Sequence, residues 1–362
     1  MGVHVSAHER FRFKTLDEIR SKAAELGLSL EFDEDLSPLA RPVQIGDLVA
    51  PNALIVHPME GCDGERDGRP GELMIRRYER FARGGAGLLW FEATAIEHAG
   101  RANPRQLTIT AETLPHIQAM LDHSLDLARQ ANGPDFRPVT VLQLTFSGRY
   151  SKPDGAPAPV LAHHDGVLDP HMGIPADHPL ATDEELEALR DRYVEAATLA
   201  QQAGFDAVDV KMCHRYLLSE LLAAHTRPGR YGGSFENRTR LPYEIVESIP
   251  RSVPGLMVTT RLNVYDGHPY PWGWGVSRED PTVPDLEEPL RFIRGLYERG
   301  VRLLYLHPAR DWSLARTQAF VKTLAAELRA AGYPPGAAGS DKLGRTAPLP
   351  RLLLFFGVGA AL

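Results

Sequence analysis

The sequence predicts an α/β fold, a TIM (β/α)8 barrel whose seventh and eighth βα units are incomplete. Three observations lead to this prediction. A short apolar run recurs six times, each time followed by a segment with helical spacing. Most of these runs are apolar on both faces, as a parallel sheet covered by helices requires. Beyond residue 331 there is one further strand candidate, at 352–359, and no helical pattern follows it.

The six predicted strands are rich in β-branched or aromatic residues and cover 53–59, 87–96, 139–146, 205–212, 256–264 and 301–308. Helical segments are predicted near 71–83, 110–131, 183–203, 236–250, 284–299 and 312–331. In the helix at 183–203, Thr182 and Glu185 form a capping box and Gly204 ends the helix. Six βα units in one chain favour a barrel over a doubly wound sheet.

We expect a single barrel domain, 1–362, with an atypical C-terminal tail at 332–362. Residues 149–181 form a long loop rich in Pro, Gly and His, which is typical of a lid or a substrate wall. Residues 332–351 are expected to be irregular coil because Gly and Pro dominate them. The tail is interpreted as truncated or out-of-frame sequence, or as a natural variant that closes the barrel differently.

Composition favours small-molecule chemistry. The 362 residues are 43% hydrophobic and 24% charged, with a net charge of −7 and an isoelectric point near 6.1. Without a broad basic field, neither nucleic acid nor a membrane is an expected partner. The two cysteines cannot build a disulfide framework, and the N-terminus lacks an apolar run, so a cytoplasmic location is expected. A homo-oligomer is compatible with the sequence, which does not fix the oligomeric state.

Polar residues follow or end several predicted strands, where barrel active sites lie. Gln143 and Arg261 would point into an apolar barrel, where an unpaired polar group costs several kcal/mol, and a polar ligand could satisfy both. Lys211, His214 and Tyr216 offer a cation, an imidazole and a phenol within six residues. A structural role is open for each of them alone, but their joint placement favours a catalytic site.

The stretch RPGRYGGSFENRTRLPYEIV (227–246) contains the most specific string in the chain, YGGSFENRTR. It resembles the signature of the Old Yellow Enzyme family of FMN-dependent reductases. The resemblance continues through segments 52–59, 91–94, 143–149, 213–222 and 259–263, and covers roughly residues 40–310. The physical role of the string is structural: Gly232 and Gly233 allow a tight turn, and Ser234 can cap the helix that follows.

The resemblance implies an NAD(P)H:flavin oxidoreductase with FMN as cofactor and NADH or NADPH as electron donor. Such an enzyme passes hydride through the flavin to an activated C=C bond or a related acceptor. The resemblance also implies that Pro58, Met59 and Ala93 line the flavin. Gln143 would hydrogen-bond its pyrimidine part, and Arg261 would place positive charge near its N1–C2 carbonyl.

For the catalytic residues, the family's pair that holds the substrate oxygen falls on Lys211 and His214. Lysine departs from the two histidines, or histidine and asparagine, of the family, and it could pair with Glu60 or Glu92 instead. Tyr216 matches the tyrosine that protonates the substrate α-carbon. No metal is expected, because the spacing in the histidine-rich loop, which holds His163, His164, Asp165, His171 and His178, fits no structural zinc pattern.

Two alternatives remain open. The chain could be a pseudoenzyme or a damaged gene product unable to bind flavin, since the family's phosphate-binding loops leave only Gly357 and Gly359 as matching residues. It could instead be a Schiff-base lyase that uses Lys211, and burial of Lys211 with a lowered pKa would favour this interpretation.

Overall fold

The computed structural model describes residues 12–28, 35–307, 322–323, 326–327, 329–330, 335–337 and 352–356. The chain divides into two compact units, Met1–Ser37 and Pro38–Leu362. In the first unit, helix α1 (Leu16–Glu25) begins with a capping box between Thr15 and Glu18. The second unit contains the main sheet and its helices. The prediction of one domain over 1–362 stays a prediction.

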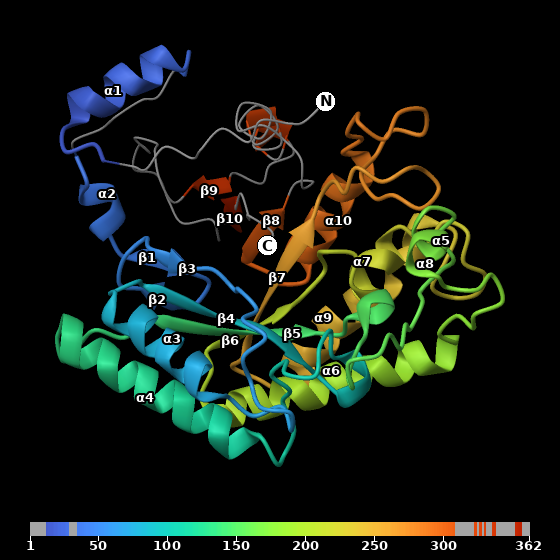
Figure 1. Ribbon diagram of the computed structural model, residues 1–362, viewed down its shortest axis with the longest axis horizontal. Helices are drawn as coiled ribbons and strands as arrows, with labels where there is room; N and C mark the ends of the chain where they lie inside the picture. Colours follow the sequence, from blue (N-terminus) through green and yellow to red (C-terminus); the bar gives the residue numbers. More distant parts are fainter. Residues whose placement is uncertain are drawn as a thin grey trace, which may run out of the picture. The chain divides into compact units, whose positions relative to one another are not determined.

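The second unit is built on a curled eight-stranded sheet (Figure 1). Each strand pairs in parallel with its neighbours. The strands, in spatial order, are β3 (Ile55–Val56), β4 (Leu88–Ala95), β5 (Val139–Thr145), β6 (Ala207–Val210), β7 (Met257–Asn263), β8 (Leu303–His307), β10 (Leu352–Phe356) and β9 (Pro335–Ala337). From β3 to β8 the spatial order follows the chain, as it does in a barrel.

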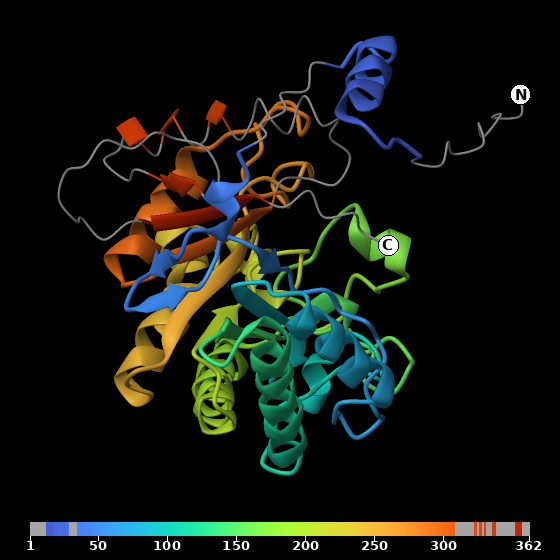
Figure 2. The same ribbon diagram turned by 90° about the vertical axis from the view of Figure 1, so that its left-hand side faces the viewer.

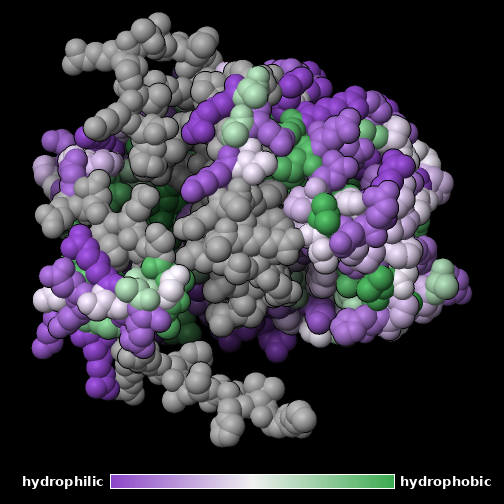
Figure 3. Space-filling model, turned by 90° about the horizontal axis from the view of Figure 1, so that it is seen from above, coloured by the Kyte–Doolittle hydropathy of each residue, from purple (hydrophilic) through white to green (hydrophobic). Residues whose placement is uncertain are grey.

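The long helices cover the outer side of this sheet (Figures 1 and 2). They are α3 (Glu72–Arg83), α4 (Leu114–Asn132), α6 (Asp183–Ala203), α9 (Arg240–Ser252) and α10 (Glu287–Glu298). The shorter ones are α2 (Ser37–Ala40), α5 (Leu168–Met172), α7 (Leu217–Leu222), α8 (Phe235–Arg238) and the 3-10 turns η1 (His98–Gly100) and η2 (Gly148–Tyr150). No helix in the described residues is long and apolar enough to cross a membrane. Seen from above, the described surface is largely hydrophilic (Figure 3).

The six predicted strands all form within their predicted ranges, and the capping box at Thr182 and the left-handed Gly204 are both present. The helix predicted at 236–250 is broken at Thr239 into α8 and α9. Of the helix predicted at 312–331, residues 322–323, 326–327 and 329–330 are described and are helical. The remainder of that prediction lies outside the described residues.

The last strands differ from the expectation in one respect. Residues 335–337, predicted as coil, form strand β9 parallel to β10. The proline at its start is tolerated because β9 is an edge strand, where a missing N–H breaks no ladder on the outer side. In the described part of the chain the sheet runs linearly, with β3 and β9 at its edges. The parallel strand order of a barrel is therefore confirmed, and the incompleteness predicted for the last two βα units concerns residues that lie largely outside the described ranges.

A small hairpin closes the N-terminal end of the barrel. Strands β1 (Val43–Ile45) and β2 (Leu48–Ala50) pair antiparallel around Gly46, whose φ of +58° favours glycine. Ile45 and Ala50 are buried against side chains at the starts of the barrel strands. Those side chains are Leu88, Val139, Ala207 and Leu303.

Side-chain alternation places polar groups inside the barrel. Asp209 and Lys211 share the inner side of β6 and its extension with Ala207, because residues two apart in a strand face the same way. By the same alternation Gln143 lies on the inner side of β5 and Arg261 on that of β7. The C-terminal half of the barrel interior is therefore polar and charged, whereas the N-terminal half is apolar.

Candidate active site

The backbone turns sharply after β6, where the predicted catalytic residues lie. His214 and Arg215 have φ values of +61° and +55°, in the left-handed region that non-glycine residues rarely adopt. Tyr216 follows in extended conformation as the residue before α7. Two consecutive strained residues of this kind are found mainly at functional sites.

Lys211 and Tyr216 lie together below this turn. Nζ of Lys211 is 3.9 Å from the centroid of the Tyr216 ring, and the lysine is 3% exposed. Burial lowers the pKa of Lys211 and raises that of Tyr216 well above its usual value. The phenol therefore keeps its proton, as a proton donor must.

His214 is exposed beside them. Its ring centroid is 6.4 Å from that of Tyr216, and its backbone N–H donates to Oδ1 of Asn263 at 3.4 Å. The three predicted catalytic residues thus occupy one end of the barrel. Both carboxylates named as alternative partners of Lys211 have other contacts: Glu92 pairs with Arg77, and Glu60 accepts from Nδ2 of Asn103 at 2.8 Å. Glu60 also interacts electrostatically with Lys211.

Asp209 is the central polar group of the barrel interior, and the sequence analysis missed it. Its Oδ2 accepts from Nε2 of Gln143 at 2.5 Å and from Nε1 of Trp90 at 3.0 Å, and its Oδ1 accepts from the backbone N–H of Arg261 at 2.7 Å. Burial raises the pKa of Asp209 to about 6 despite these donors. Gln143 therefore has a hydrogen-bond partner inside the barrel, whereas the sequence suggested a ligand as its partner.

Arg261 is less well satisfied. Its guanidinium donates to the carbonyl oxygen of Pro58 at 3.3 Å and lies 4.4 Å from the centroid of the Tyr305 ring. Its Nε is buried without a partner among the described residues. A buried N–H without an acceptor is costly, so an electron-rich ligand atom at this position would be stabilised.

The end of β3 lies beside Arg261. Pro58 is buried, whereas Met59 is 58% exposed. The His57 ring packs on Tyr305 with centroids 4.8 Å apart, and burial, with Arg261 nearby, lowers the pKa of His57. The next residue, Glu60, is largely shielded from water, which raises its pKa.

Ala93 lies in a bulge of β4. The pairing register with β5 shifts between Phe91 and Thr94, so β4 carries one extra residue there. The Ala93 carbonyl accepts from Nε2 of Gln106 at 3.0 Å, and the residue is 2% exposed. Its neighbour Glu92 is buried against Arg77, and burial raises the pKa of Glu92 to about 7. Bulges of this kind commonly re-aim side chains beside active sites.

Arg149, which follows β5, has a structural role. Its buried guanidinium pairs with Asp169 and Glu220 and donates to the carbonyl oxygen of His163. The histidine-rich loop is held by similar contacts, for example between His164 and Asp169. In the described residues, no group of three or more His, Cys, Asp or Glu could hold a metal ion.

The stretch 227–246, which contains the signature string, also anchors the long loop. Arg227 donates to the carbonyl oxygens of Ala162 at 2.8 Å and Ala181 at 2.6 Å. Ser234 accepts from the backbone N–H of Asn237, as predicted for a helix cap, and Gly233 has a φ of +80°. Arg238 donates to the carbonyl oxygens of Leu222 and Gly233.

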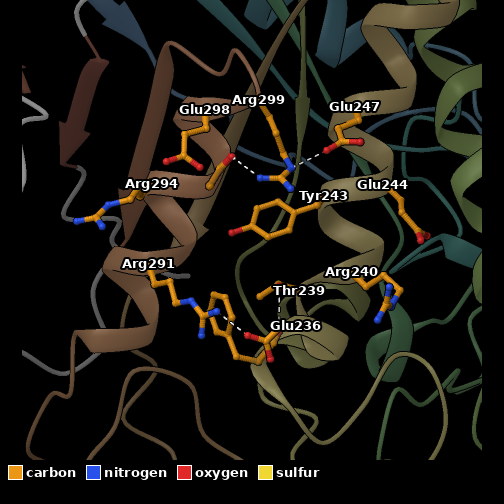
Figure 4. Close-up of a pocket in the computed structure, with 12 residues that line it drawn as sticks. Glu236, Thr239, Arg240, Tyr243, Glu244, Glu247, Arg291, Arg294, Glu298 and Arg299 are labelled. Carbon is orange, nitrogen blue, oxygen red and sulfur yellow. Dashed lines mark hydrogen bonds and ion pairs between the residues drawn. The ribbon is translucent and has the colours of Figure 1, made fainter.

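A pocket of about 510 Å³ lies elsewhere, on the outer side between α9 and α10 (Figure 4). Four of its eight charged side chains pair with one another: Arg299 with Glu247 at 2.7 Å, and Arg291 with Glu236. Barrel active sites lie at the C-terminal ends of the strands, and this pocket lies between two outer helices. We therefore assign the candidate site to the strand ends and not to this pocket.

The comparisons with known proteins show the family of the chain. The model of the NADH:flavin oxidoreductase / NADH oxidase family matches residues 38–270, a range that contains every predicted site residue. An NADH oxidase of Thermoanaerobacter brockii is 26% identical over 274 residues, which are 73% of this chain and 38% of that protein. The chain thus spans well under half the length of that relative.

Two further matches cover more of the other protein. An NADPH dehydrogenase of Bacillus subtilis is 26% identical over 276 residues, which are 74% of this chain and 72% of that protein. The solved structure of the old yellow enzyme homologue from Zymomonas mobilis has a TM-score of 0.60 at 20% identity, and the match covers 79% of this chain and 85% of that one. This last likeness supports the barrel fold.

Proposed function

Because the chain belongs to the NADH:flavin oxidoreductase / NADH oxidase family, we propose that it is an FMN-dependent enzyme that reduces an activated C=C bond with NADH or NADPH. The observation that carries the proposal is the group of buried donors at the C-terminal ends of β6 and β7. Nε of Arg261 lacks an acceptor among the described residues, Lys211 is 3% exposed, and Tyr216 lies against the lysine.

The residues at the strand ends fit FMN. Arg261 is a buried cation with an unpartnered N–H, which suits the electron-rich N1–C2 edge of the isoalloxazine. Ala93 is small and Pro58 is buried, so both would allow close approach of a flat ring. Gln143 would use its amide oxygen, since its amide nitrogen is already bound to Asp209. Met59 is exposed and would cover the ring edge.

The proposed chemistry divides between cofactor and protein. FMN, when bound, supplies a two-electron carrier between the nicotinamide and the acceptor. Lys211 and His214 would hold the carbonyl oxygen of the acceptor and stabilise negative charge on it. Tyr216, which burial keeps protonated, would give its proton to the α-carbon of the acceptor. The small-molecule acceptor, a cytoplasmic location and any homo-oligomer belong to this proposal as well.

The first experiment is an absorption spectrum of the purified protein after addition of FMN, followed by anaerobic NADH or NADPH. The proposal expects a yellow protein that bleaches on reduction and regains its colour when an α,β-unsaturated ketone is added. A protein that takes up no FMN would favour the pseudoenzyme alternative. Gly357 and Gly359, the matches to the family's phosphate loops, lie outside the described residues.

Substitution of the proton donor gives the first mechanistic prediction. Tyr216→Phe should leave reduction of the flavin by NAD(P)H unchanged and slow reduction of the acceptor about 100-fold or more, because the phenolic proton is used only in the second step. Rapid-mixing measurements of the two half-reactions separate these effects. Tyr297→Phe, on α10, is the matched control and should change neither rate. Equal slowing of both half-reactions by Tyr216→Phe would contradict the assigned role.

One observation favours a second candidate function. Burial lowers the pKa of Lys211, as a Schiff-base nucleophile requires. Sodium borohydride treatment in the presence of an aldehyde should then attach the aldehyde carbon chain covalently to Lys211, detectable by peptide mass. The reductase proposal expects no such adduct above the level seen in Lys211→Met.

A further inference from the structure

We propose that Arg215 is a positioning residue, whose guanidinium ties the loop after β5 to the loop after β7 and thereby fixes the turn that carries His214 and Tyr216. The inference rests on the proposed function, because the group that Arg215 positions is the proton donor of that reaction. It goes beyond that proposal by assigning a role to residues that contact neither FMN nor acceptor.

The backbone at this turn needs external support. A left-handed conformation costs a non-glycine residue about 1–2 kcal/mol, and His214 and Arg215 both adopt it. Glycine would adopt this conformation at little cost. The backbone preference of arginine opposes the left-handed conformation at residue 215. The contacts of the Arg215 side chain therefore explain why an arginine is found there.

The Arg215 side chain makes three contacts across the barrel end. Nη1 lies 2.8 Å from Oδ2 of Asp266, and Nη2 lies 2.9 Å from Oδ2 of Asp165. Nη2 also donates to the carbonyl oxygen of Trp272 at 3.2 Å. Asp165 belongs to the long loop after β5, whereas Asp266 and Trp272 belong to the loop after β7. One guanidinium thus bridges two loops from a third strand end.

The two carboxylates are themselves well held. The Asp165 side chain is fully buried and accepts from the backbone N–H groups of Val167 and Leu168, both at 2.9 Å. It also lies 2.8 Å from Nε2 of His268, which belongs to the other loop. Asp266 accepts from the backbone N–H of His268 at 3.0 Å. Loss of one member of a buried ion pair leaves an uncompensated charge, so these contacts are hard to break singly.

The loops also pack directly against each other. A Cβ atom added at Gly166 would lie 2.6 Å from the Trp272 indole, so the ring packs on bare backbone there. Glycine at this position is what allows Asp165, its neighbour, to approach Arg215. The lid or substrate wall predicted for 149–181 is therefore docked on the loop after β7, and Arg215 lies at the junction.

The contacts between the two loops influence the position of Tyr216 through the backbone of Arg215. Arg215 directly precedes Tyr216, so rotation of the Arg215 backbone moves the Tyr216 ring. Misplacement of a reacting group by about 1 Å can cost roughly 100-fold in rate. Reduction of flavin by NAD(P)H does not use Tyr216, so it should be insensitive to the same change.

The experiment compares Arg215→Gly, Arg215→Lys, Asp165→Asn and Asp266→Asn in the FMN-loaded protein, with 2-cyclohexen-1-one as acceptor. Arg215→Gly keeps the backbone geometry favourable and removes only the side chain. We expect wild-type rates of flavin reduction and reduction of the acceptor at least about tenfold slower. Arg215→Lys should restore part of the loss, since lysine can reach one carboxylate. Arg192→Lys, an exposed arginine on α6, is the control.

The double variant Arg215→Gly/Asp165→Asn distinguishes a shared network from separate effects. It should be no slower than Arg215→Gly alone, because both changes break the same bridge. The proposal would be overturned if Arg215→Gly reduced the acceptor at the wild-type rate. It would also be overturned if the double variant lost the sum of the two single decreases in that rate. If Arg215→Gly does not fold, the two aspartate variants carry the same test.

A readout without catalysis separates this proposal from the proposed function. Limited digestion with thermolysin should cut within the loop at residues 160–175 at least about tenfold faster in Arg215→Gly than in the wild type, because the loop loses its anchor. If the wild type is not reduced by NAD(P)H, the proposed function fails. Equal digestion rates would instead refute the loop tie.

Discussion

Asp209 shows how the barrel interior holds a charge without a matching cation in direct contact. Three N–H donors, from Gln143, Trp90 and the backbone of Arg261, satisfy its oxygens. Burial nevertheless dominates and raises the pKa of Asp209 to about 6. Neutral donors and a peptide group offset only part of the cost of removing a carboxylate from water.

This shift predicts a pH-dependent stability. Because its folded pKa is above the ordinary value of 3.8, Asp209 favours the folded state below pH 4 and loses that contribution as the pH rises to about 6. The loss is roughly 3 kcal/mol. Urea unfolding between pH 4 and 7 should show this decline in the wild type and a smaller decline in Asp209→Asn. Parallel pH profiles for the two proteins would contradict a raised pKa at this residue.

At the residue scale, alternation along strands was enough to predict that Gln143 and Arg261 point into the barrel. It was not enough to find Asp209, because its partners come from three other strands and depend on their register. Arg215 gave no signal either, since a left-handed φ at a non-glycine residue cannot be read from sequence. The catalytic and cofactor roles assigned to the eight site residues stay predictions.

At the scale of single elements, helix α6 offers a direct test. The Thr182 side chain accepts from the N–H of Glu185, and the Glu185 carboxylate accepts from the N–H of Thr182 at 2.7 Å. Thr182→Ala should lower the free energy of unfolding by about 1 kcal/mol, measured by urea denaturation. Thr198→Ala, in the same helix and partly buried, serves as control and should change stability by less than about 0.5 kcal/mol. If Thr182→Ala and Thr198→Ala lower the free energy of unfolding equally, the capping contact contributes no more to stability than the control position does.

Long periodic elements were predicted well, whereas most of the very short strands were not; β3 has two residues but lies within a longer apolar run. Strands β4, β5 and β7 carry seven or eight residues, enough to show a buried apolar run. Strands β1, β2 and β9 have three residues each, too few to show any period. Their pairing depends on contacts with distant segments, which a local pattern does not contain.

At the scale of the whole molecule, the order of the last strands decides how the sheet ends. Strand β10 lies between β8 and β9, with Leu354 opposite both Leu304 and Ala337. The final strand along the chain is therefore an inner strand of the sheet. This argues that residues 352–356 are part of the fold, whereas the tail was interpreted as truncated or out-of-frame sequence or as a natural variant that closes the barrel differently.

Proline substitution tests that placement. Leu354→Pro removes a backbone N–H from a strand with neighbours on both sides, and should destabilise the protein by about 3 kcal/mol or more. Thermal denaturation would report a clearly lower Tm. Leu354→Val keeps the N–H and should lower the Tm far less. If the proline variant melts like the wild type, β10 does not pair in the sheet.

The arginine before the signature string has one more consequence. Arg227 donates to the main-chain carbonyl oxygens of Ala162 and Ala181, which every amino acid possesses. These two positions of the loop after β5 can change their side chains without losing the contact with Arg227, whereas Asp165 and Asp169 are held through their carboxylates. The loop is therefore fixed to its scaffold partly through contacts that do not depend on which side chains it carries.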